Sequence, residues 1–208
     1  MARIAAQPYE RQTWSTELAK QAGLVVGASL FVALCARVTV PLPFTPVPLT
    51  LQNFGVLVVG LLLGSRRGFA ALAVYLVEGA FGLPVFNPAG PGGIAQILGP
   101  TGGFLMAYPL VAFVAGWIYE RTGKQIPEHI SEHISETSPR RFGWAVLSSV
   151  AAEIVLFAGG LSWLAVLTQS LSLAIKFGLY WFVFAEVIKV LMAAAIATRW
   201  NQRLSPRP

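Results

Sequence analysis

Glu186 and Lys189 are two oppositely charged residues inside an apolar stretch near the C-terminal end of the chain. A spacing of three residues places both side chains on one face of a helix. A charged side chain near the middle of a bilayer costs about 2.5–3.5 kcal/mol on insertion scales, so this face would be unfavourable against lipid. The pair is therefore predicted to face the interior of a helix bundle and to contact a ligand there. A purely structural ion pair is the alternative.

Arg37, Glu78 and Glu153 are the other ionisable residues that interrupt apolar segments. Arg37 lies close enough to the end of its segment to extend its charged group to the membrane surface. Glu78 and Glu153 could each bind a ligand, carry a proton or bond to a neighbouring helix. As an acid and a base they are the best candidates for an intramembrane enzyme, but no nucleophile, metal set or phosphate loop accompanies them. We expect no enzymatic activity and no ATPase in this chain.

A repeated tetrapeptide contains the two histidines that could form a metal site. The tetrapeptide Glu-His-Ile-Ser occurs twice, at 128–131 and 132–135, so His129 and His133 could share a helical face. A solvated linker is the preferred interpretation, because no Cys or Asp completes a metal-binding set. We therefore predict no metal and no cofactor. Cys35 is the single cysteine, so it forms no intramolecular disulfide.

The composition places the chain in a lipid bilayer. Hydrophobic residues make up 55% of the 208 positions and charged residues 12%, about half the usual charged share of a soluble domain. A water-soluble fold of this size could not bury so much apolar surface. The net charge of +6 does not indicate nucleic-acid binding, because the basic residues form no stripe interleaved with aromatic residues.

Six apolar segments approach the roughly 20 residues needed to cross a bilayer. The first ends at the prolines of 41–48, which remove backbone donors and cannot continue a helix. The predicted fold is an all-α bundle of six transmembrane helices. The segments are about 21–40, 49–64, 68–83, 101–119, 142–168 and 172–199.

The distribution of positive charge predicts the orientation. Of the 15 Lys and Arg residues, 12 fall in the two terminal segments and in alternate connections, whereas the loops 41–48, 84–100 and 169–171 contain none. By the positive-inside rule both termini are cytoplasmic. We expect a cytoplasmic segment at 1–20, a membrane domain at 21–200 and a cytoplasmic tail at 201–208. The first twenty residues contain no apolar run, so they are not expected to be a cleaved signal peptide.

The two long outer loops, 41–52 and 82–103, are rich in Pro and Gly. Irregular backbone near the membrane is tolerated only against protein or a cavity. These loops are therefore predicted to fold over a binding site, with ordinary surface turns as the alternative.

Small residues recur every four positions near the start of the first segment, at Ala19, Gly23 and Gly27. Such a stripe lets another helix approach closely. The second helix could belong to this chain or to a partner protein.

Four runs in the first half of the chain carry a family resemblance: PLPFTPVPLTLQ, GLLLGSRRG, GLPVF and GPTGGF. Together and in this order they resemble the BioY family, the biotin-specific substrate-binding (S) components of energy-coupling-factor (ECF) transporters. The resemblance is dense from about 24 to 119 and returns in the last apolar segment.

This resemblance implies a six-helix S-component fold with a vitamin site near the outer face of the bacterial cytoplasmic (inner) membrane. It implies biotin as the ligand, and as partners a membrane-embedded coupling (T) subunit and two cytoplasmic ATPase subunits, which alone use ATP. By analogy, the stripe of small residues docks on the coupling subunit. Some family members lack dedicated partners. An S component for thiamine or riboflavin is the alternative, and the loop motifs argue against it.

The resemblance also implies a set of binding residues. The family carries an acidic residue, usually Asp, three positions before a lysine in its last helix, which corresponds to Glu186 and Lys189. An Asn after the PVF run corresponds to Asn87, and Gln52 closes the first loop motif. Biotin presents two ureido N–H donors, so Glu186 can accept from them and the Asn87 amide can donate or accept. Lys189 can pair with Glu186 or meet the ligand carboxylate.

Aromatic rings near these positions are predicted to pack on the apolar bicycle of biotin, as is usual in pockets with few polar groups. The rings are Tyr75, Phe86 and Phe44.

Overall fold

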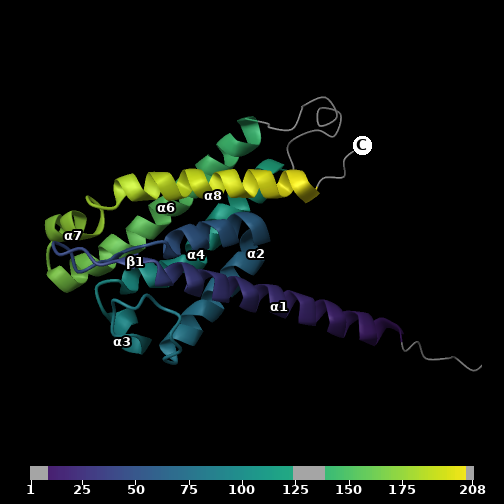
Figure 1. Ribbon diagram of the computed structural model, residues 1–208, viewed down its shortest axis with the longest axis horizontal. Helices are drawn as coiled ribbons and strands as arrows, with labels where there is room; N and C mark the ends of the chain where they lie inside the picture. Colours follow the sequence, from purple (N-terminus) through teal and green to yellow (C-terminus); the bar gives the residue numbers. More distant parts are fainter. Residues whose placement is uncertain (1–8, 124–138, 205–208) are drawn as a thin grey trace, which may run out of the picture.

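The computed structural model describes residues 9–123 and 139–204. These residues form helices joined by short loops (Figure 1). One small antiparallel ladder pairs Thr39 with Thr50 and Val40 with Leu49. In chain order the elements are α1 (Tyr9–Arg37), β1 (Thr39–Val40), β2 (Leu49–Thr50), α2 (Gln52–Ala80), α3 (Gly93–Leu98), α4 (Gly102–Gly123), α6 (Pro139–Thr168), α7 (Leu171–Gly178) and α8 (Val183–Leu204).

Several of these helices are long and apolar enough to cross a membrane. Among the described residues there are four such helices, namely Thr16–Arg37, Gln52–Ala80, Gly102–Thr122 and Pro139–Thr168. The pair α7 and α8 passes the same test together and would make a fifth span. The prediction of an all-helical, multi-pass membrane protein is thus confirmed. The number of six spans and the cytoplasmic termini stay predictions.

α2 is sharply bent at Gly64, whose backbone is non-helical with φ 81° and ψ 179°. A methyl group on Gly68 would lie 3.3 Å from the Cα of Gly60. Positions eight apart in a straight helix are separated by about 12 Å. The two arms of α2 therefore fold back on each other, and they correspond to the predicted segments 49–64 and 68–83.

Glu120 of α4 stabilises this turn. Its carboxylate accepts hydrogen bonds from the backbone N–H of Ser65 at 3.0 Å and from the Ser65 hydroxyl at 2.9 Å, which caps the start of the second arm. A Cβ atom at Gly64 would lie 1.8 Å from Glu120 Oε1, and the positive φ disfavours any side chain. Only glycine fits this position.

The predicted sixth segment, 172–199, is not continuous. α7 ends at Gly178, and α8 begins at Val183 with its axis bent by 52°. At Gly178 the backbone packs so closely on α6 that a methyl group would lie 2.9 Å from Leu161 Cδ2. Glycine is also a weak helix former. The prediction of one unbroken helix was wrong here because the break contains no proline and remains fully apolar.

The Pro- and Gly-rich loops gather at one end of the molecule. The β1–β2 hairpin, α3 and α7 lie together there, whereas both ends of the described chain lie at the opposite end (Figure 1). The core is formed mainly where α2, α4 and α6 pack, with Leu57, Leu72 and Val111 fully buried. The loop end is therefore where a cavity between helix ends can open.

Candidate functional site

A cavity opens at the loop end, between the β1–β2 hairpin, the start of α2, α4, α6 and the break before α8. Its empty volume is about 520 Å³, counted out to its open mouth. Ligand sites typically have mostly apolar walls with a few polar groups, and this cavity has both. The principal apolar walls are Phe104, Leu105, Leu156, Phe157 and Phe182. The principal polar groups are Thr50, Gln52, Asn53, Asn87, Glu186 and Lys189.

Glu186 and Lys189 face this cavity from the first turns of α8. Lys189 Nζ donates to Glu186 Oε1 at 2.7 Å, and each residue is only 7% exposed. The pair lies on the face of α8 that points into the bundle, whereas Val183 and Phe184 in the same first turn are exposed. The prediction that this face points inward is confirmed.

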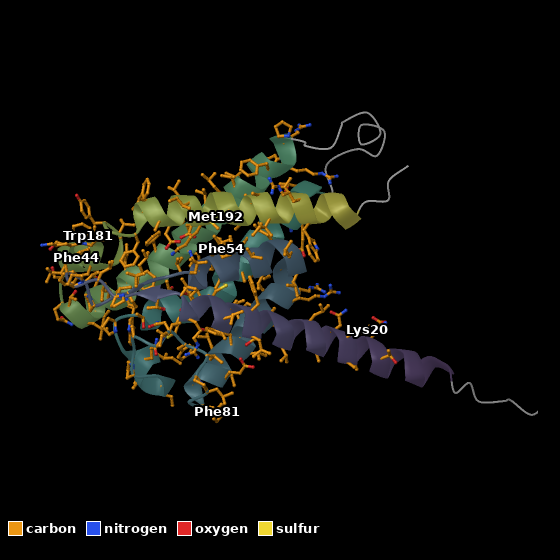
Figure 2. All side chains as sticks on the ribbon, in the orientation of Figure 1. Lys20, Phe44, Phe54, Phe81, Trp181 and Met192 are labelled. Carbon is orange, nitrogen blue, oxygen red and sulfur yellow. The ribbon has the colours of Figure 1, made fainter. Side chains whose placement is uncertain are left out.

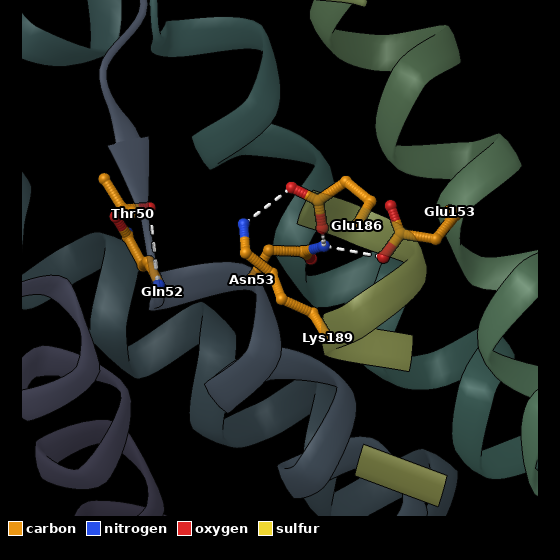
Figure 3. Close-up of polar contacts among 6 residues, drawn as sticks. All are labelled: Thr50, Gln52, Asn53, Glu153, Glu186 and Lys189. Atoms are coloured by element: carbon orange, nitrogen blue, oxygen red, sulfur yellow. Dashed lines mark hydrogen bonds and ion pairs between the residues drawn. The ribbon is translucent and has the colours of Figure 1, made fainter. Parts of the chain in front are cut away.

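Asn53 connects the pair to a second acid. Its Nδ2 donates to Glu186 Oε2 at 2.8 Å and to Glu153 Oε1 at 2.6 Å (Figure 3). One amide in the first turn of α2 thus holds carboxylates from α6 and α8. From the sequence the role of Glu153 stayed open, and Asn53 was not predicted as a site residue. The available signal was a second amide directly after Gln52 at the start of an apolar segment.

Gln52 and Asn87 also line the cavity, as the resemblance implied. Gln52 Nε2 donates to the Tyr75 hydroxyl at 2.7 Å, and this hydroxyl donates to the Val85 carbonyl at 2.9 Å. These two bonds fix the loop that carries Asn87 against both arms of α2. Asn87 is 4% exposed, and its Oδ1 has no hydrogen-bond partner among the described residues.

The three predicted aromatic residues lie outside the cavity wall. Tyr75 is completely buried, with its ring edge-on to Phe86 at 5.4 Å between centroids. Phe86 is itself pressed against Gly79, where a methyl group would lie 2.0 Å from the ring. Phe44 is 45% exposed and packs on Trp181 at 4.3 Å between centroids (Figure 2). The rings that do line the cavity are Phe104, Phe157, Phe182 and Tyr108.

Glu78 and Arg37 lie away from the cavity. Glu78, on the second arm of α2, accepts a hydrogen bond from the hydroxyl of Ser29 on α1. Of the three roles that the sequence left open, the bond to a neighbouring helix is the one observed. Arg37 is exposed at the end of α1. Glu78 therefore joins two helices, and Arg37 lies at the surface.

The stripe of Ala19, Gly23 and Gly27 faces outward on α1. A methyl group on Gly23 or Gly27 would meet nothing within 4 Å, so these two glycines do not pack against the described residues of the chain. The histidines at 129 and 133 lie outside the described residues. Within 9–123 and 139–204, no three His, Cys, Asp or Glu side chains are grouped as metal ligands would be.

The BioY family model matches residues 9–206, nearly the whole chain. The chain belongs to the BioY family. A probable biotin transporter BioY of Pyrococcus horikoshii is 36% identical over 183 residues, covering 87% of this chain and 96% of that protein. The biotin transporter BioY of Thermotoga maritima is 34% identical over 176 residues, covering 84% and 94%.

A solved structure shares the fold of this BioY chain. The crystal structure of the S-component for biotin from an ECF-type ABC transporter superposes with a TM-score of 0.71, covers 95% of each chain and is 23% identical. The family predicted from the loop motifs is thus confirmed, and so is the S-component type of helical fold.

Proposed function

We propose that this protein captures biotin for uptake, as the substrate-binding component of an ECF transporter in the bacterial cytoplasmic membrane. The observation that carries this proposal is a cavity with aromatic walls that also contains a carboxylate, a lysine and several amides. Relatives along almost the full chain are named as biotin transporters.

The polar groups of the cavity suit the ureido ring of biotin. This ring presents two N–H donors and one carbonyl acceptor beside an apolar bicycle. The Glu186 carboxylate can accept a hydrogen bond from an N–H, and the Asn87 amide can donate or accept one. Phe104, Phe157 and Phe182 offer apolar surface for the bicycle. Lys189 donates to Glu186 and is also exposed to the cavity, where it can meet the ligand carboxylate.

Equilibrium titration of the purified protein tests the proposal. We expect biotin to bind tightly with one-to-one stoichiometry, and neither thiamine nor riboflavin to compete. Absence of biotin binding in a folded preparation would overturn the assignment. Competition by thiamine or riboflavin would instead favour an S component of different specificity.

Transport is proposed to need a coupling subunit and two ATPase subunits, which consume ATP. The outward-facing stripe at Ala19, Gly23 and Gly27 supports a docking role for α1, since all three residues are exposed and the two glycines have open space beside them in the described part of the chain. Gly23→Leu and Gly27→Leu should impair co-purification with the coupling subunit and leave biotin affinity unchanged. Gly143→Leu is a matched control, because Gly143 on α6 also has nothing within 4 Å.

Accumulation of biotin against a gradient in vesicles containing only this chain would contradict the need for partners.

A further inference from the structure

The orientation of the Asn53 amide is determined by its two partners. Glu153 and Glu186 present carboxylate oxygens, which accept hydrogen bonds when charged, whereas an amide has one donating and one accepting end. Only Nδ2 can face both acids as a donor, and each of its two N–H groups then has one acceptor. The ion pair with Lys189 makes Glu186 an acceptor, so Nδ2 is the end of the Asn53 amide that faces the two acids.

This orientation leaves Asn53 Oδ1 as an acceptor without a partner. The residue is 3% exposed and lines the cavity, but Oδ1 accepts no hydrogen bond from the described residues. The nearby cation does not serve it: Lys189 Nζ donates to Glu186, and no hydrogen bond joins Nζ to Asn53 Oδ1. A buried acceptor left unpaired costs about 1–3 kcal/mol, so a donor on the ligand would be stabilising here.

We propose that Asn53 is a further ligand-binding residue whose Oδ1 accepts one ureido N–H of biotin, and that Glu153 is a positioning residue for it. This inference rests on the proposed function. Asn53 and Glu186 then supply neighbouring acceptors for the two N–H donors of a cyclic urea. The cavity would select ligands by the number of adjacent N–H groups as well as by their apolar shape.

Glu153 acts through Asn53, because it contributes no surface to the cavity itself. It is 8% exposed, and its Oε1 accepts the shorter of the two bonds from Nδ2. Acceptors on α6 and α8 fix the directions of both N–H groups and thereby fix the direction of Oδ1. The carboxylates of both acids contact the first turn of α2, where the helix dipole favours negative charge.

A chemical double-mutant cycle tests the proposed hydrogen bond. Biotin would be compared with two cyclic carbamates, in each of which one ureido N–H is replaced by a ring oxygen. One carbamate should bind the unmodified protein about tenfold more weakly than biotin, the size of a lost hydrogen bond to a buried group. The same carbamate should bind Asn53→Leu as well as biotin does, since the acceptor is gone. If each carbamate loses as much affinity relative to biotin in Asn53→Leu as in the unmodified protein, the proposal is overturned.

Ser149→Ala serves as the matched control for this cycle. It removes another buried polar group of the bundle, one that bonds to Ala145 and does not line the cavity. It should keep the preference for biotin over the carbamate. Loss of that preference in Ser149→Ala would show that the cycle reports general damage, and this would contradict the assignment to Asn53.

A second variant covers the case in which Asn53→Leu fails to fold. The double variant Asn53→Leu/Glu153→Gln removes the acceptor at position 53 together with the charge of one of the two acids that would otherwise lose their donor. It should bind the carbamate as well as biotin. If the folded double variant keeps the preference for biotin, the inference is wrong.

The role of Glu153 has its own readout. Glu153→Leu should reduce the preference for biotin over the carbamate, and Glu153→Gln, whose amide oxygen can accept the same bond, should restore it. An unchanged preference in Glu153→Leu would remove Glu153 from this role. Failure of biotin to bind the unmodified protein would overturn the proposed function itself, whereas full biotin affinity in Asn53→Leu would overturn only this inference.

Discussion

Glu78 and Glu186 are both carboxylates inside apolar helices, but their surroundings differ. Glu78 accepts from one hydroxyl, that of Ser29, and does not line the cavity at the loop end. Glu186 has Lys189 on one oxygen and Asn53 on the other, and it faces an empty volume of about 520 Å³. An acid within an apolar helix is therefore not sufficient to indicate a binding site. Convergent polar groups with unpartnered atoms beside a cavity are the better criterion.

The difference follows from where each acid lies along its helix. Glu78 lies within the second arm of α2, where the neighbouring α1 covers it. Glu186 lies in the first turn of α8, directly after the break at 179–182. Helix ends leave space that side chains of other helices do not fill, so polar groups placed there can meet a ligand.

Loss of the buried cation should have the largest effect. Lys189→Met leaves Glu186 near Glu153 without a compensating charge, and breaking a buried pair in this way typically costs about 3–5 kcal/mol. Thermal unfolding in detergent should show a large drop in stability. Lys176→Met, at an exposed position on α7, is the control and should be neutral. Equal stability of the two variants would mean that Glu186 does not need Lys189.

Removing the charge of Glu186 should act mainly on binding. Glu186→Gln replaces one acceptor oxygen by a donor that would oppose a ureido N–H, so biotin affinity should fall by about 1.5–3 kcal/mol. Glu186→Asp should lose less, since the family usually carries Asp. Titration of Glu78→Gln should give the unmodified affinity. Unchanged affinity in Glu186→Gln would remove Glu186 from the site, and a loss in Glu78→Gln would break the distinction between the two acids.

The Glu78 side of the comparison predicts a smaller change, confined to stability. Ser29→Ala removes the donor to Glu78, which is only partly buried, and should cost about 1 kcal/mol of unfolding free energy. Biotin affinity should not change. Ser162→Ala, at an exposed position on α6, should change neither quantity. Reduced biotin affinity in a stable Ser29→Ala protein would connect Glu78 to the site.

The smallest effect is expected at Phe44. Its ring packs on Trp181 beside the cavity, so Phe44→Ala should weaken biotin binding by about 0.5–1 kcal/mol through a less ordered loop. Phe81→Ala is the control, because Phe81 is 85% exposed at the end of α2. A loss of several kcal/mol would instead indicate direct contact with biotin, as the sequence analysis predicted.

The helices were predictable because their signals are local. Apolar runs indicated the spanning segments, and the glycine-containing GSRR run separated the two arms of α2. Glu186 and Lys189 could be named as site residues because charges are costly in such segments. Asn87 and Gln52 could be named because the loop motifs that carry them resemble those of the BioY family. All four line the cavity.

The remaining features depend on contacts between distant parts of the chain. No local pattern says that Asn53 meets both Glu153 and Glu186, which lie 100 and 133 positions away. The Tyr75 ring was expected to contact ligand, but its hydroxyl bonds to Gln52 and to the Val85 carbonyl, which draws the ring into the core. The break after Gly178 also has no sequence signal, since Leu179–Phe182 is as apolar as the helices beside it.

The reversal at Gly64 has a consequence for biosynthesis. The arms 52–63 and 65–80 would extend only about 18 Å and about 24 Å at about 1.5 Å per residue, less than the roughly 30 Å hydrocarbon core. Neither arm has the length that a translocation channel normally releases into lipid as an independent helix. The arms should therefore partition from the channel together, as one helical hairpin. α4, which supplies Glu120 to the turn, is synthesised after the hairpin. The hairpin should therefore insert before the residue that caps its turn is present.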